Sequence, residues 1–69
     1  MVYPNRIRTL RRQRGLSQHA LAEATGLNAR MIRRIERGEI AILPGLLQRF
    51  AQVFDVPASE LIPSAANRA

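Results

Sequence analysis

The chain has 69 residues, no cysteine and a formal net charge of +6, and 46% of its residues are hydrophobic. A chain this short buries only about 60% of its unfolded surface, so we expect one small domain with a tight apolar core. The lack of cysteine excludes disulfides and cysteine-based zinc sites. The longest uncharged run, residues 40–48, is too short to cross a bilayer, and the opening residues do not resemble a secretory leader. We therefore expect a cytoplasmic protein without a metal, a cofactor or a membrane partner.

The positive charge is concentrated in the first half of the chain. Residues 1–38 contain nine arginines against Glu23 and Glu36, whereas residues 39–69 contain two arginines against three acidic residues. A surplus of one sign on one half indicates that this half faces a polyanion.

Three glycines and two polar residues divide this first half into helices. Gly15, Gly26 and Gly38 each follow a stretch with helical spacing of apolar residues, and glycine suits the left-handed position that ends a helix. Ser17 and Asn28 are strong N-cap types because their side-chain oxygens accept bonds from free backbone N–H groups. The pattern predicts helices over residues 5–14, 17–25 and 28–37.

The second half begins with a short apolar segment. Residues 40–43 are predicted as a loop, with a short strand as the alternative. Pro44 suits the first position of a helix, which we expect over residues 44–54. A fifth helix is predicted over residues 58–62, before Pro63. The sequence thus predicts an all-α, compact five-helix domain over residues 1–62, followed by a flexible tail over 63–69.

The second and third predicted helices form a helix-turn-helix pattern. Gly26 allows a sharp reversal, and Ile32 and Ile35 turn one face of the third helix inward. The opposite face then carries four arginines that repel one another, which favours contact with an anion such as nucleic acid. A solvated basic surface is the alternative interpretation. The outward residues are Ala29, Arg30, Arg33, Arg34 and Arg37.

The sequence resembles the XRE family, which contains the lambda-repressor-like and Cro-like DNA-binding domains. The resemblance covers residues 6–62. One segment departs from the family pattern: the loop after Gly38 is usually basic, whereas this chain has Glu39 followed by apolar residues. The matching stretches are Arg6–Arg11, Gly15–Gln18, Leu21–Ala22, Thr25–Leu27, Ile32, Arg34–Gly38, Phe50–Ala51 and Val56 to Glu60–Leu61.

The resemblance implies a role for individual residues. It implies that Ala29, Arg30, Arg33 and Arg34 read base edges in the major groove, where arginine pairs with guanine O6 and N7. It also implies a structural ion pair between an arginine of the first helix and a glutamate late in the third, here Arg11 and Glu36. Phosphate contacts are expected from Ser17, Gln18, Asn28, Arg37 and, secondarily, Arg11.

Apolar residues in the second half exceed the needs of a small core. Ile40, Ile42, Phe54 and Ile62 are candidate dimer contacts, because the resemblance implies dimers formed through the fifth helix and nearby loops. We expect a homodimeric, sequence-specific transcriptional regulator, most simply a repressor on a palindromic operator. The alternative is an antitoxin-type module that binds a toxin or other protein partner and regulates its own operon. We expect no enzymatic activity, because Ser17 is better explained as a helix cap than as a nucleophile.

Overall fold

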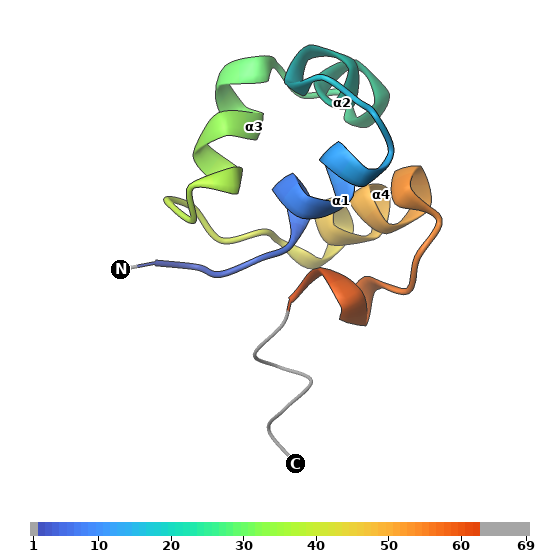
Figure 1. Ribbon diagram of the computed structural model, residues 1–69. Coiled ribbons are helices and arrows are strands. Elements are labelled where there is room, and N and C mark those ends of the chain that lie inside the picture. The colour runs from blue at the N-terminus through green and yellow to red at the C-terminus, as the bar shows by residue number, and fades with distance from the viewer. Residues whose placement is uncertain (1, 63–69) are drawn as a thin grey trace.

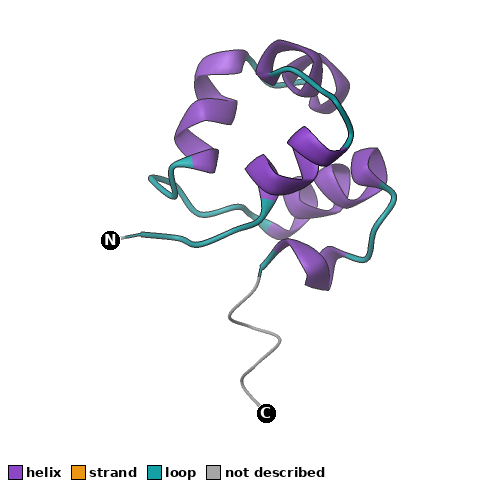
Figure 2. Ribbon diagram, in the orientation of Figure 1, coloured by secondary structure: helices purple, strands orange, loops and turns teal. Residues whose placement is uncertain are grey.

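In the computed structural model, residues 2–62 are described, and they form four α-helices followed by one 3₁₀ turn (Figure 1). This part of the chain contains no strand, and residues 40–43 form a loop (Figure 2). No helix here is long enough to span a membrane. The predicted tail, 63–69, lies outside the described residues. The elements are α1 (Ile7–Gln13), α2 (Gln18–Thr25), α3 (Ala29–Glu36), α4 (Pro44–Phe54) and η1 (Ala58–Leu61).

The prediction of five α-helices is wrong, because the last element is a 3₁₀ turn of four residues. Its bond runs from the Glu60 N–H to the Pro57 carbonyl, three residues earlier (3.0 Å). A segment that starts after one proline and stops before another is too short for the α-helical bonding pattern to extend. The first helix is also shorter than predicted, beginning at Ile7 instead of residue 5.

The helix boundaries in the first half follow from local caps, as the sequence predicted. The Ser17 hydroxyl accepts a bond from the Ala20 N–H (2.9 Å), and the Asn28 side chain accepts one from the Met31 N–H (2.8 Å). Glycines with positive φ angles follow α1, α2 and α3. Each of these helices therefore begins or ends where a neighbouring residue satisfies its free backbone groups.

The core lies between the helix-turn-helix and α4. Phe50 and Phe54 stack at 6.2 Å, and both are fully buried. Phe54 is therefore unavailable as a contact for a second copy of the chain, which corrects the prediction made for it. The fully or nearly fully buried hydrophobic residues are Ile7, Leu10, Leu21, Ala22, Ile32, Ile35, Phe50, Ala51, Phe54 and Leu61.

Hydrogen bonds from the segment before α1 hold the end of α3 against the rest of the domain. The Tyr3 N–H donates to the Gly38 carbonyl (2.9 Å), and Asn5 Nδ2 donates to the Ile35 carbonyl (2.8 Å). The Arg6 N–H donates to the Leu61 carbonyl (2.8 Å). Together with Ile32 and Ile35 in the core, these bonds fix the direction in which α3 points.

Candidate nucleic-acid interface

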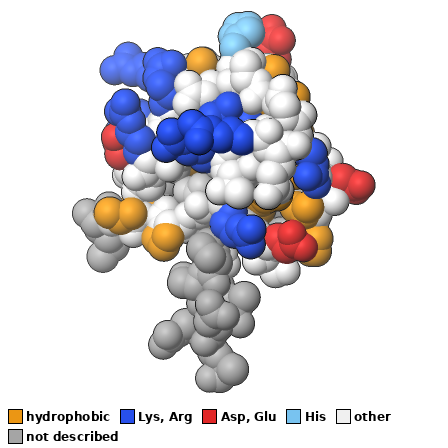
Figure 3. Space-filling model, viewed as in Figure 1, with side chains coloured by type: hydrophobic (Ala, Val, Ile, Leu, Met, Phe, Trp, Pro, Cys, Tyr) orange, Lys and Arg blue, Asp and Glu red, His pale blue; other side chains and the backbone are white. Residues whose placement is uncertain are grey.

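The face of α3 that points away from the core is basic. Ile32 and Ile35 are fully buried, so residues on the opposite side of the helix face outward. In the space-filling view, arginine side chains gather over α3 and over neighbouring α1 (Figure 3). Ala29, at the first turn, is partly exposed, whereas all four outward arginines are exposed: Arg30, Arg33, Arg34 and Arg37.

A recess of about 520 Å³ opens beside this face, where α1, the start of α2 and α3 meet. Five arginines and one glutamate line it, so its formal charge is strongly positive. An open, positively charged recess at the start of a helix can hold a phosphate group through side-chain and backbone N–H donors. The lining residues are Arg8, Arg11, Arg12, Ser17, Gln18, Arg33, Glu36 and Arg37.

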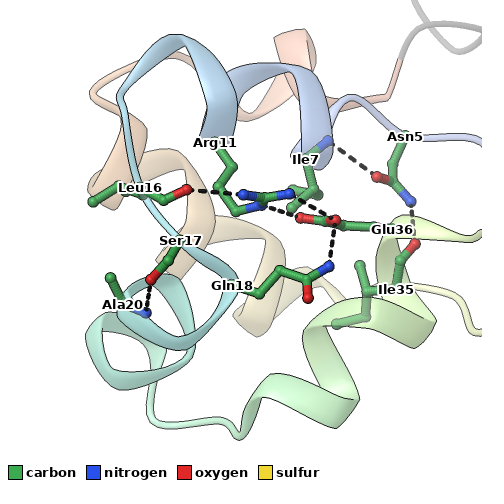
Figure 4. Close-up of polar contacts among 9 residues, drawn as sticks. All are labelled: Asn5, Ile7, Arg11, Leu16, Ser17, Gln18, Ala20, Ile35 and Glu36. Atoms are coloured by element: carbon green, nitrogen blue, oxygen red, sulfur yellow. Dashed lines mark hydrogen bonds and ion pairs between the residues drawn. The ribbon is translucent and has the colours of Figure 1, made fainter.

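Glu36 of α3 lines this recess and bonds to side chains of α1 and α2 (Figure 4). Its two carboxylate oxygens accept bonds from Arg11 Nε (2.6 Å) and Arg11 Nη2 (3.3 Å). Gln18 Nε2 donates to the same carboxylate (3.1 Å), and Arg11 Nη1 donates to the Leu16 carbonyl (2.8 Å). The side chains of Arg11 and Glu36 are only 11% and 4% exposed. Because three nitrogens of Arg11 already have protein acceptors, its first role is to tie α1 to α3.

The residues predicted to contact phosphate are only partly gathered in one place. Ser17, Gln18 and Arg37 line the recess together with Arg11. Asn28 is exposed at the start of α3 and does not line it. Arg33, predicted to read bases, also lines the recess, so it lies at the boundary between the recess and the outward face of α3.

Two residues of the recess had no assigned role in the sequence analysis. Arg8 and Arg12 lie four residues apart on α1, and both line the recess. Residues at this spacing share one face of a helix. The spacing could have indicated that Arg8 and Arg12 act together. Only the packing of α1 against α3 shows that their shared face of α1 points into the recess.

Two other arginines serve the fold. Arg14 Nε donates to the Phe54 carbonyl at the end of α4 (3.1 Å), and Arg49 Nη1 donates to the Thr25 carbonyl at the end of α2 (3.2 Å). Guanidinium groups at these positions satisfy free carbonyls and complement the negative end of the helix dipole. Within the described residues, some arginines thus serve the fold and others form the exposed basic surface.

The apolar residues considered for dimerisation lie elsewhere. Ile40, Ile42 and Ile62 are partly buried against the core. Among residues 2–62, the exposed large hydrophobic residues are Val2, Tyr3 and Leu43.

Comparison with known proteins places this geometry in a family. The helix-turn-helix family profile matches residues 7–61, which is most of the chain and includes all five elements. The chain belongs to the XRE-type helix-turn-helix family of DNA-binding transcriptional regulators. It is 32% identical over 62 residues to the helix-turn-helix-type transcriptional regulator YazB of Bacillus subtilis (strain 168), covering 90% of each chain.

Two solved structures have the same fold. The restriction-modification controller protein C.AhdI from Aeromonas hydrophila superposes with a TM-score of 0.74 at 33% identity, over 80% of each chain. The clp gene regulator ClgR from C. glutamicum superposes with a TM-score of 0.76 at 23% identity, over 91% of this chain and 83% of that one. The second likeness is one of fold alone.

Proposed function

We propose that the protein binds double-stranded DNA sequence-specifically and represses transcription by occupying a promoter. The observation that carries the proposal is the continuous basic surface formed by the outward face of α3 and the adjoining recess. A helix whose outward side chains are long and positive fits the major groove, and a flanking phosphate site fixes its register on the duplex.

Individual contacts follow from this placement. Arg30 and Arg34 are exposed on α3 and are assigned to guanine, to which arginine can donate two parallel bonds. Ala29, at the first turn, is assigned to a thymine methyl group. Arg33 lies both on the outward face of α3 and in the lining of the recess, so it is assigned to the boundary between the base edges and the phosphate backbone of the DNA. The phosphate contacts are assigned to Ser17, Gln18, Asn28 and Arg37. Arg11 is only a secondary phosphate contact, because its guanidinium is already bound to Glu36.

A dimer on a palindromic operator completes the proposal. One α3 offers few base contacts, so specific affinity requires a second copy, with the two recognition helices about 34 Å apart. Exposed apolar side chains support a protein contact: Val2 and Leu43 are 70% and 72% exposed, and Tyr3 is 40% exposed. Ile40 and Ile42, in the same loop as Leu43, and Ile62, after η1, remain candidates for that contact.

The same exposed apolar side chains also support the alternative function. In that case the chain is an antitoxin-type module, and the loop before α4 binds a toxin while α3 binds the promoter. A second polypeptide that purifies with the protein at fixed stoichiometry would favour this alternative. Sedimentation of the purified protein as a dimer without another polypeptide would favour the repressor.

The proposal is tested by the binding of wild-type protein and variants to duplexes with a randomised centre, with the bound fraction sequenced. Arg34→Ala should reduce the preference for guanine at one position by about 1–3 kcal/mol. Arg6→Ala is the matched control: Arg6 is exposed, lines no part of the recess and lies outside α3, so the sequence preference should persist. An Arg34→Ala protein with an unchanged preference would contradict the assignment.

The salt dependence of the same binding reaction tests the phosphate contacts. The logarithm of the association constant should fall linearly with the logarithm of salt concentration, with a slope of about −0.9 for each phosphate neutralised. Gln18→Ala should weaken binding to every sequence alike. If the affinity did not change between low and moderate salt, the basic surface would not be the contact surface.

A further inference from the structure

Glu39 lies three residues after the end of α3, and its carboxylate lies between Arg34 of that helix and Arg37, the residue that caps it. Glu39 Oε1 accepts a bond from Arg34 Nε (3.3 Å), and Glu39 Oε2 lies 3.5 Å from Arg37 Nη1. An acidic residue next to a DNA-binding helix repels phosphate, so its presence calls for a reason beyond charge balance.

The backbone holds Glu39 at this position. The Gly38 N–H donates to the Ile35 carbonyl (2.9 Å), and the Glu39 N–H donates to the Arg34 carbonyl (3.0 Å). These two bonds form a Schellman motif, which requires the left-handed conformation that Gly38 adopts at φ +76°. Glu39 is therefore fixed beside the turn of α3 that carries Arg34, and only its side-chain torsions remain to be set.

The ion pair engages one particular edge of the Arg34 guanidinium. Glu39 accepts from Nε, and within residues 2–62 neither Nη nitrogen of Arg34 donates a hydrogen bond to the protein. Guanine is read by two parallel N–H groups of one arginine. An arginine held through Nε keeps both Nη groups available for such a pair, and it has less freedom to turn toward a phosphate.

We propose that Glu39 is a specificity-determining residue that holds the Arg34 guanidinium in the orientation for guanine and disfavours contacts with non-cognate DNA. The inference rests on the proposed function, because it requires Arg34 to read a base. It has two consequences. The carboxylate lowers the affinity for all duplexes because it repels phosphate. This loss of affinity is smallest on duplexes in which Arg34 pairs with guanine.

Glu39→Gln is the direct test, because the amide has nearly the same shape but no charge. On duplexes with a randomised centre, Glu39→Gln should bind the unselected pool more tightly than wild type does. Its preference for guanine at the position that depends on Arg34 should fall about tenfold, within the range carried by one arginine–guanine pair. Glu39→Asp keeps the charge but withdraws the carboxylate, so it should lose preference without binding the pool more tightly.

Glu60→Gln is the matched control, because Glu60 is exposed on η1 and makes no ion pair within the described residues. It removes the same charge and should raise affinity for all duplexes alike. If Glu39→Gln behaved as Glu60→Gln does and retained the guanine preference, Glu39 would act as a charge only, and the inference would be overturned.

Arg34→Ala and the double variant distinguish a failure of the function proposed for Arg34 from a failure of the role proposed for Glu39. If Arg34→Ala alone left the preference unchanged, the proposed function of Arg34 would fail, and the role of Glu39 would fail with it. If Arg34→Ala abolished the preference and Glu39→Gln did not alter it, only the role of Glu39 would fail. In the double variant, Glu39→Gln should cause no additional loss of preference, because the residue acts through Arg34.

Discussion

Glu36 and Glu39 lie three residues apart, and each holds two side chains, yet their surroundings are opposite. Glu36 is 4% exposed and binds Arg11 and Gln18 from other helices. Glu39 is 43% exposed and pairs with Arg34 of α3 and with Arg37, the residue that caps α3. The strength of an ion pair depends on the effective dielectric constant around it, which is lower at Glu36. Removing one partner of the first pair should therefore cost the fold more, whereas the second pair lies on the surface that we propose binds DNA.

The largest effect is expected from Glu36→Gln. The substitution leaves the Arg11 guanidinium nearly buried without a counter-ion, and breaking one partner of a buried pair costs about 3–5 kcal/mol. Because the recess is open to water, we expect a loss near 3 kcal/mol, a large fraction of the stability of a domain this small. Urea unfolding followed by circular dichroism measures it. A loss below about 1 kcal/mol, as for an exposed pair, would remove the distinction between the two glutamates.

The next effect concerns Gly38, whose turn separates the two glutamates. An added Cβ there would lie 2.8 Å from Val2 Cγ1 and 3.2–3.3 Å from backbone atoms of Tyr3, whereas a Cβ at Gly15 meets no atom within 4 Å. Both glycines have positive φ, so alanine at either position should cost about 1–2 kcal/mol. Gly38→Ala should cost about 1 kcal/mol more, because it also crowds the segment before α1.

Gly15→Ala is thus the control for backbone strain without crowding. Thermal unfolding of the two variants under one set of conditions gives the difference. If the two variants lost the same stability, the segment before α1 would move away from the added methyl group at little cost. Its bonds to the end of α3 would then contribute little to holding that helix in place.

The parts of this molecule that sequence alone predicts are those set by neighbours in the chain. Ser17 and Asn28 were predictable as caps because a side chain bonds to an N–H three residues later. The inward turn of Ile32 and Ile35 followed from helical spacing. The fifth helix was not predicted correctly, because at Ala58–Leu61 helix length, and not composition, decides between α and 3₁₀ bonding.

The parts that sequence could not supply depend on contacts between distant segments. Arg8 and Arg12 join the recess only because α1 packs beside α3. Arg14 and Arg49 bond to carbonyls 40 and 24 residues away, so their structural role has no local signal. Phe54 is of a residue type that is common at protein interfaces, but its packing against Phe50 places it in the core.

The smallest effect is expected from Glu39→Gln on stability. Its partners are about half exposed or more, and exposed ion pairs contribute about 0–1 kcal/mol. The loss should also shrink in 1 M salt, where the screening length is about 3 Å, whereas the loss in Glu36→Gln should persist because that pair is nearly buried. Urea unfolding of both variants at low and high salt measures the contrast. If the two losses were equal and equally insensitive to salt, both glutamates would belong to one structural network. A small, screened loss at Glu39 instead means that a change in its DNA preference reflects the interface and not the fold.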